Sequence, residues 1–339
     1  MDVTKLPKKV FSGYIKSAAH VQGIATDGEY MYYSFTTRLV KTDMEGNLIG
    51  TADGLTGHLG CIAYSDTDHC VYGSLECKND GIGKGILANL GITEQNPDAF
   101  FLTRFDVSRI TKPHMDAIGD GIMTMVKLTD VCEDYLYDDG NIKHRHGCSG
   151  IDGVTIVPDF MGARTIFVAY GIYGDVERED NDDQVLIAFD HAALQNKFAP
   201  IRQNDNNEGV RADRKLFVHT GNTTFGIQNL EYDSHTDCLL AAVYCGKKPQ
   251  FPNRHMYFID LSKPVYEEDG KTRLTLAKRG LPHESGIWGS DFELGSTGMI
   301  SLGDGYYYFS KSGSEKELGN YSSVTMYRID GTGNFVPAE

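Results

Sequence analysis

The chain has 339 residues, including 38 glycines and 19 tyrosines, a composition that suits many short strands joined by tight turns. Its 32 basic and 47 acidic residues give a formal net charge of −15, which argues against partners such as duplex nucleic acid or an anionic membrane. No apolar run approaches the roughly 18 residues of a membrane span, and no signal peptide is visible at the start. We expect a cytoplasmic protein that binds a small molecule; secretion after removal of a signal peptide stays open.

The first predicted elements form a compact unit of strands. An alternating stretch at 9–16 predicts an edge strand, and 23–35 reads as a strand, an Asp27-Gly28 turn and an aromatic strand, which indicates a hairpin. A further strand ends at Asp43, and 47–50 suits a fourth strand.

The same unit recurs along the chain. Further hairpins are predicted, in chain order, at 62–75, 154–170, 230–244 and 299–310. Each is followed by an alternating strand that ends in aspartate, at Asp106, Asp190, Asp260 and Asp330. Aspartate after a strand favours a turn, so the repeat marks the outer edge of a hairpin-plus-strand module.

Five such modules without helical periodicity predict an all-β fold, a five-bladed β-propeller of antiparallel four-stranded blades. The expected blades occupy 17–56, 57–120, 145–200, 220–275 and 285–339. The strand at 9–16 is expected to pair with the last blade and help to close the ring. Segment 121–144 either finishes the second blade or forms an insertion.

The first blade, from Gly23 through the Asp27-Gly28 turn to Asp43 and Asn47, resembles the blades of NHL-type and gluconolactonase-type propellers. The resemblance covers the repeat pattern and implies the fold. The metal-ligand motifs of the gluconolactonase-type enzymes are not identifiable in the chain, so their activity is not implied.

In a propeller, residues that precede the innermost strands converge on one mouth of the axis, where variable loops form a concave site. His20, His58 and Asp152 hold this position, and we expect them to form the catalytic or metal-binding centre if the protein is an enzyme. A divalent metal, metal-free acid–base catalysis and plain hydrogen bonding are the three alternatives. The alternative function is a non-enzymatic protein-interaction scaffold.

Loops between the second and third strands of each blade should open at the same mouth. Four of them carry a cation, and with other polar and aromatic groups they form the expected set of substrate-binding residues: Arg38, Glu76, Lys78, Tyr173, Gln228, Lys247, Trp288 and Lys311. Cations around one funnel predict a small anionic or carbohydrate ligand, acted on by a hydrolase or lyase in the enzymatic case. Ordinary solvated lysines are the alternative.

Carboxyl groups around the axis suggest a second kind of chemistry, because paired carboxylates act as acid and base in glycoside hydrolysis. The candidates are Asp152, Glu76, Glu231 and Asp291. The glycine-containing loop at 78–98 is expected to cover the funnel. Among the seven cysteines, Cys61 and Cys70 flank a predicted hairpin and are the one pair that the pattern suggests as a disulfide.

Overall fold

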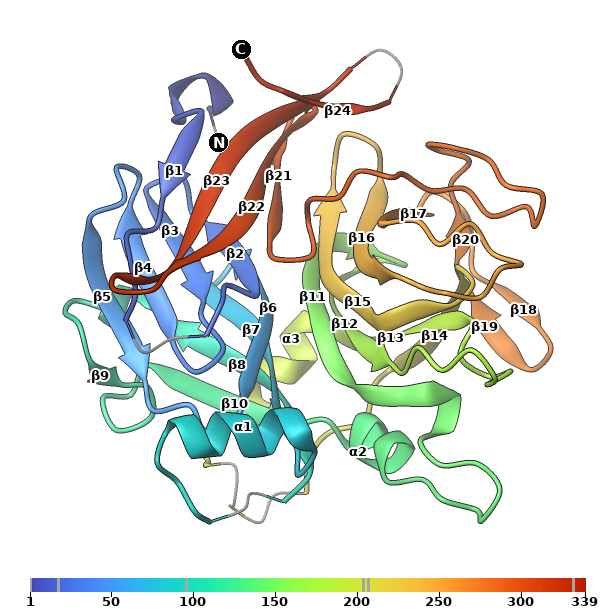
Figure 1. Cartoon of the computed structure of the whole chain (residues 1–339), viewed down its shortest axis with the longest axis horizontal. Helices are drawn as coiled ribbons and strands as arrows, with labels where there is room; N and C mark the ends of the chain where they lie inside the picture. The colour runs from blue at the N-terminus through green and yellow to red at the C-terminus, as the bar shows by residue number, and fades with distance from the viewer. Residues whose placement is uncertain (1, 17–18, 95–96, 203–204, 206–207, 331–332) are drawn as a thin grey trace.

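The computed structural model describes residues 2–16, 19–94, 97–202, 205, 208–330 and 333–339. The chain forms a five-bladed β-propeller in which five small, mainly antiparallel sheets surround an axis (Figure 1). The innermost strands of the five sheets are β2 (Gly23–Thr26), β6 (His58–Ser65), β11 (Cys148–Phe160), β15 (Thr223–Asp233) and β21 (Met299–Gly303). Each inner strand contacts the next one, and β21 contacts β2, so the ring is closed. The predicted fold is confirmed.

In each of the first two blades the strands are added outward from the axis. After β2 the first sheet contains β3 (Tyr30–Ser34), β4 (Leu39–Asp43), β5 (Leu48–Asp53) and the short β9 (Met115–Asp116). After β6 the second sheet contains β7 (Cys70–Cys77), β8 (Ala99–Asp106) and β10 (Met123–Lys127).

The remaining blades are built from the second half of the chain. The third sheet adds β12 (Ala163–Ile172), β13 (Asp183–Asp190), β14 (Arg214–His219), β19 (Lys271–Arg273) and β18 (Tyr266–Glu268). The fourth adds β16 (Cys238–Cys245), β17 (Met256–Asp260) and β20 (Thr275–Leu276). The fifth adds β22 (Tyr306–Glu315) and β23 (Gly319–Ile329), and it takes β1 (Lys9–Phe11) and β24 (Phe335–Pro337) from the two ends of the chain.

Several blades depart from the expected four antiparallel strands. Strand β10 belongs to the second sheet and β14 to the third, so these blades extend beyond residues 120 and 200. The third sheet has six strands, and the pairs β14–β19 and β5–β9 are parallel. Segment 121–144 does both things that the sequence allowed, because β10 completes a blade and α2 (Thr129–Tyr135) follows as an insertion.

The repeated aspartates have a physical role at the outer turns. At the end of β4 the Oδ1 atom of Asp43 accepts hydrogen bonds from the backbone N–H groups of Glu45 and Asn47. The other four aspartates likewise accept from a backbone N–H two to four residues later. The side chain thereby satisfies amide groups that have left the sheet, which explains why the residue recurs.

The hydrophobic core is divided among the interfaces between neighbouring blades. Five clusters of buried apolar side chains each join one sheet to the next around the ring. The cluster between the last and first blades includes Val10 of β1, which lies opposite Val324 of β23. Each blade therefore buries its faces only against its neighbours, as a ring of repeats requires.

Helices are short and lie in the connections. They are α1 (Gly81–Asn89), α2 and α3 (His191–Leu194), with 3-10 turns at Val3–Lys5, Val107–Arg109, Arg145–Gly147 and Gln195–Lys197. In the described parts of the chain, none of the helices has the length and apolar character that crossing a bilayer requires.

All seven cysteines are free thiols, so the suggested disulfide is wrong. The sulfur of Cys61 lies 3.3 Å from the carbonyl oxygen of Val154 near the axis, whereas Cys70 contacts the carbonyl of Asp68 at the outer turn. In the antiparallel pair Cys70 lies opposite Ser65 instead.

Candidate functional site

A cavity of about 340 Å³ lies at one mouth of the axis, which we call the funnel. Pockets for small-molecule ligands have volumes of roughly 300–1,000 Å³, so the funnel suits a small ligand. Six residues of the expected site line it, and they come from four different blades: His20, His58, Glu76, Lys78, Asp152 and Gln228.

Irregularities in three neighbouring inner strands shape the floor of the funnel. The pairing register shifts between Leu59 and Ile62 in β6, and again in β11 and β15 around Asp152 and Gln228. A bulge turns a side chain out of the normal alternation of a strand, and bulges are common beside active sites. The three shifts occur at one level of the axis and place Asp152 and Gln228 in the cavity wall.

The imidazole of His58 lies between two carboxyl groups. Its Nδ1 atom is 3.7 Å from Oε1 of Glu76 and 3.7 Å from Oδ1 of Asp152, too far for a hydrogen bond. That nitrogen is buried and makes no hydrogen bond within the described part of the chain. Burial lowers the pKa of His58 to about 3, and the neighbouring Lys78 cation acts in the same direction. At neutral pH the ring is therefore uncharged and can accept or donate a hydrogen bond.

Glu76, at the end of β7, has a cation for a partner. Its Oε1 atom accepts a hydrogen bond from Nζ of Lys78 at 2.7 Å, and Oε2 accepts from the backbone N–H of Ile151 at 3.2 Å. The carboxylate packs over Gly150, where a Cβ atom would collide with Oε2. Burial raises the pKa of Glu76, while the Lys78 charge and the two hydrogen bonds oppose that rise.

Asp152, on β11, has no cation in direct contact. Its Oδ2 atom accepts a hydrogen bond from Nε2 of Gln228 at 3.3 Å, and Oδ1 lies against Gly60, where an added Cβ would approach to 2.5 Å. Burial raises the pKa of Asp152 well above its ordinary value, and the nearby charge of Glu76 raises it further. The two carboxyl groups therefore have different environments within one cavity.

Lys78 is used within the protein. Besides Glu76, its amine donates to the carbonyl of Ser149 at 3.0 Å and lies 3.4 Å from Oδ2 of Asp80. Contacts with two carboxylates raise its pKa, so it stays a cation. Its three protons already face protein oxygens, so the expectation that Lys78 holds a ligand anion does not match its contacts.

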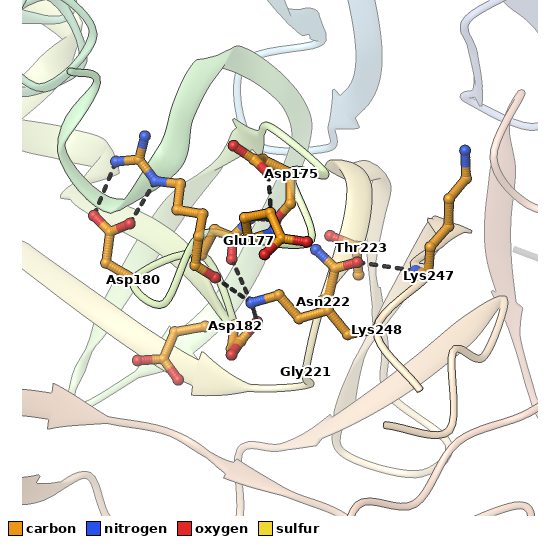
Figure 2. Close-up of polar contacts among 12 residues, drawn as sticks. Asp175, Glu177, Asp180, Asp182, Gly221, Asn222, Thr223, Lys247 and Lys248 are labelled. Carbon is orange, nitrogen blue, oxygen red and sulfur yellow. Dashed lines mark hydrogen bonds and ion pairs between the residues drawn. The ribbon is translucent and has the colours of Figure 1, made fainter. Parts of the chain in front are cut away.

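The other expected cations do not line the funnel. Arg38 lies 3.6 Å from the carboxylate of Asp53, and Lys311 is exposed on β22. Figure 2 shows that Lys247 and Lys248 point in different directions: Lys248 contacts Asp182, whereas the Lys247 side chain extends away from that cluster. The ring of cations that the sequence suggested is therefore not formed.

The two aromatic residues of the expected site also lie elsewhere. Tyr173 packs with the ring of His144, at a centroid distance of 5.2 Å, and Trp288 lies in a connection of the fourth blade. Neither lines the funnel. Asp291, one of the candidate carboxylates, is exposed and pairs with Arg254 at 2.8 Å.

Glu231 lies in a second, smaller cavity of about 130 Å³, which only inner-strand residues line. Its Oε1 atom accepts from the backbone N–H of Ser301 at 2.8 Å, and burial raises the pKa of Glu231 to about 8. The two expected histidines remain together in the funnel, where Nε2 of His20 accepts a hydrogen bond from Nε2 of Gln22 at 3.0 Å.

A metal centre was one alternative for His20, His58 and Asp152. Within the described ranges, no three or more His, Cys, Asp or Glu side chains are grouped in a way that could hold a metal ion.

Some residues of the funnel were not singled out from the sequence. They are Thr36, Ser149, Phe225 and Tyr244, together with Ile82 and Ile86 of the helix α1. The loop expected to cover the funnel is thus partly helical and does line its rim. The glycines at 150 and 153, close to Asp152 in sequence, were a readable sign of tight packing in this part of β11, where an added Cβ would meet Glu76 at 150 and Ile227 at 153.

No protein-family model and no curated protein sequence matches the chain. Solved structures with a similar course of the chain include an endo-arabinanase of family GH43 from Bacillus licheniformis, with 13% identity, a TM-score of 0.41, and coverage of 96% of this chain and 97% of that one. A GH43 β-1,3-galactosidase with galactodeoxynojirimycin has 10% identity, a TM-score of 0.43, and coverage of 95% and 93%. The soluble aldose sugar dehydrogenase from Escherichia coli has 11% identity, a TM-score of 0.39, and coverage of 97% and 89%. Likeness at this level carries no argument about activity.

Proposed function

We propose that the funnel binds a small, neutral, polyhydroxylated molecule and hydrolyses a glycosidic bond in it. The observation that carries the proposal is the pair of carboxyl groups on either side of His58, only one of which has a cation in contact. Environments that separate the pKa values of two carboxyl groups allow one to act as an acid while the other stays ionised.

In the proposed reaction Asp152 is the acid and Glu76 the base. Asp152, whose raised pKa keeps its proton, donates that proton to the oxygen that leaves as the C–O bond breaks. Glu76, held ionised by Lys78, accepts a proton from the water whose oxygen bonds to the sugar carbon. One water is consumed, and the two products are a sugar and an alcohol. The neutral His58 and the amide of Gln228 supply hydrogen bonds to hydroxyl groups of the ligand.

The absence of an available cation at the described surface of the funnel favours a neutral ligand over an anionic one. Lys78 is occupied by two carboxylates, and the remaining expected cations lie outside the cavity. Apart from Glu76, Asp152 and Lys78, the polar groups of the funnel are amides, hydroxyls and imidazoles, which are suited to the hydroxyl groups of a carbohydrate.

A panel of p-nitrophenyl glycosides, with thermal-shift measurements on free sugars and sugar acids, tests the proposal. We expect turnover of at least one glycoside, and a loss of at least 100-fold in kcat/KM for Glu76→Gln and for Asp152→Asn. Asp291→Asn, which changes an exposed carboxylate outside the funnel, is the matched control and should behave as the unchanged protein. Turnover that survives both funnel substitutions, or no response to any glycoside or sugar, would overturn the proposal.

A further inference from the structure

The rim of the funnel is apolar, in contrast to its floor. Ile82, Phe225 and Tyr244 line the cavity although they are 49%, 42% and 36% exposed. Ile86 follows Ile82 by four residues on α1 and therefore lies on the same face of that helix. Large apolar side chains left open to solvent around one cavity mark a surface that something else covers.

Phe225 is held at the rim by its backbone. Its φ angle is +63°, and that of the following Gly226 is +71°. A bulky side chain in the left-handed region is costly, and such conformations gather at functional sites. The carbonyl of Phe225 accepts a hydrogen bond from Nε2 of Gln228 at 3.0 Å, and the same amide donates to Asp152. The rim and the floor are thus joined through one side chain.

The helix α1 is also attached to the floor. Asp80 caps its first turn by accepting from the backbone N–H of Gly83 at 2.8 Å, and the same carboxylate lies 3.4 Å from Lys78. The helix contains three glycines, which are poor helix formers, so these anchoring contacts are important for its position. Ile82 and Ile86 are therefore held over the cavity through Asp80, which contacts Lys78, the partner of Glu76.

We infer that the molecule bound in the funnel is amphipathic and carries an alkyl or aryl group that packs between Ile82, Ile86, Phe225 and Tyr244. The identity of its polar half rests on the proposed function. The claim that it has an apolar half rests only on the residues of the rim. Each methylene group of the ligand that is buried there should tighten binding about fourfold. The site then selects a glycoside with an apolar aglycone over a free sugar.

A fragment that represents only the apolar half separates the two claims. Binding of 2-phenylethanol is followed by NMR on protein labelled at the isoleucine δ1 methyl groups, with methyl β-D-glucopyranoside as the polar comparison. We expect 2-phenylethanol to shift the signals of Ile82 and Ile86. Its affinity, followed in every variant by saturation-transfer NMR of the fragment, should fall at least tenfold in the double variant Ile82→Ser/Ile86→Ser. Leu90→Ser removes another exposed apolar side chain that follows α1 but does not line the funnel, and should leave the affinity unchanged.

The inference is overturned if 2-phenylethanol leaves both methyl signals unmoved, or if the double serine variant binds it like the unchanged protein. Thermal unfolding of each variant shows whether it is folded. Binding of 2-phenylethanol is measured separately from glycoside hydrolysis, so failure of the proposed chemistry leaves this result intact. Hydrolysis of glycosides by a protein whose rim binds no aromatic fragment would leave the proposed function standing and remove this inference alone.

Discussion

Both cavities along the propeller axis contain a buried carboxyl group, but they are built differently. The smaller one, around Glu231, is lined only by the five inner strands, and Glu231 takes part in no ion pair among the described residues. The funnel also takes residues from second strands, from loops and from α1, and there Glu76 has a lysine partner. Inner strands alone enclose a narrow channel, whereas the added segments provide groups that can separate two carboxyl pKa values.

The largest expected effect comes from moving Glu76 without changing its chemistry. Gly150→Ala places a methyl group against Oε2 of Glu76, at a residue whose φ is +134°, so the carboxylate must leave its position. We expect activity on the glycoside found in the panel to fall at least 100-fold. Gly162→Ala adds a methyl group at another positive φ, +88°, with nothing within 4 Å, and is the control for backbone strain. Equal losses of activity in both variants would contradict the claim that displacement of Glu76 causes the effect of Gly150→Ala.

A second expected effect concerns the difference between the two carboxyl groups in the funnel. Lys78→Met removes the cation that opposes the rise in the pKa of Glu76. We expect that pKa to rise by at least one unit, measured by ¹³C NMR titration of the labelled carboxyl groups. An unchanged Glu76 titration in a folded variant would contradict the proposed division of labour between Glu76 and Asp152.

Glu231→Gln should change stability rather than activity. The pKa of Glu231 is raised to about 8 in the fold, above the value of about 4.3 in an unfolded chain. The unchanged protein therefore loses stability as the pH rises between these values, because unfolding then releases the proton that the fold retains. From pH 5 to pH 9 we expect the stability of the variant, relative to that of the unchanged protein, to increase by about 4 kcal/mol. Urea unfolding at pH 5 and at pH 9 measures the stability difference between the two proteins. An equal difference at both pH values would contradict the prediction.

The smallest expected effect is an absence of reaction at Cys61, whose free thiol is buried near the axis. Burial is the main cause that raises the pKa of this thiol to about 12. Iodoacetamide at pH 8 should leave Cys61 unmodified in the native protein and alkylate it after unfolding, as peptide mass spectrometry would show. Rapid alkylation in the native state would mean that a reagent reaches the axis between the two cavities.

The fold was predictable because the residues that repeat along the sequence have a local structural role in each blade. An aspartate such as Asp43 terminates a strand by accepting backbone hydrogen bonds, so its recurrence marks the blades directly. The strand β14 was missed, and β10 was only one of two alternatives for segment 121–144, because neither strand ends in that aspartate. The added strand of the third blade, β19, lies far along the chain.

The funnel was predictable where position along an inner strand decides direction. His58 begins β6 and Asp152 lies at a register shift inside the neighbouring β11, and both line the cavity. Loops gave no such guide: Lys247 and Lys248 are adjacent in sequence, yet one is exposed and the other is buried against Asp182. Nor did the pattern show that Lys78 would be occupied by Glu76 and Asp80, because partners of buried charges are set by tertiary packing.

The fifth blade joins strands from both ends of the chain, since β1 pairs with β23 from Lys9–Thr325 to Phe11–Ser323. During synthesis the strand near the start must wait for more than three hundred further residues before its partner exists. Blades one to four can assemble in order as they emerge, but the last seam can form only after residues 323–325 have been made. Until then the apolar side chains of the first and fourth blades that pack against the fifth lack their neighbour, and exposed apolar surface of this kind favours aggregation.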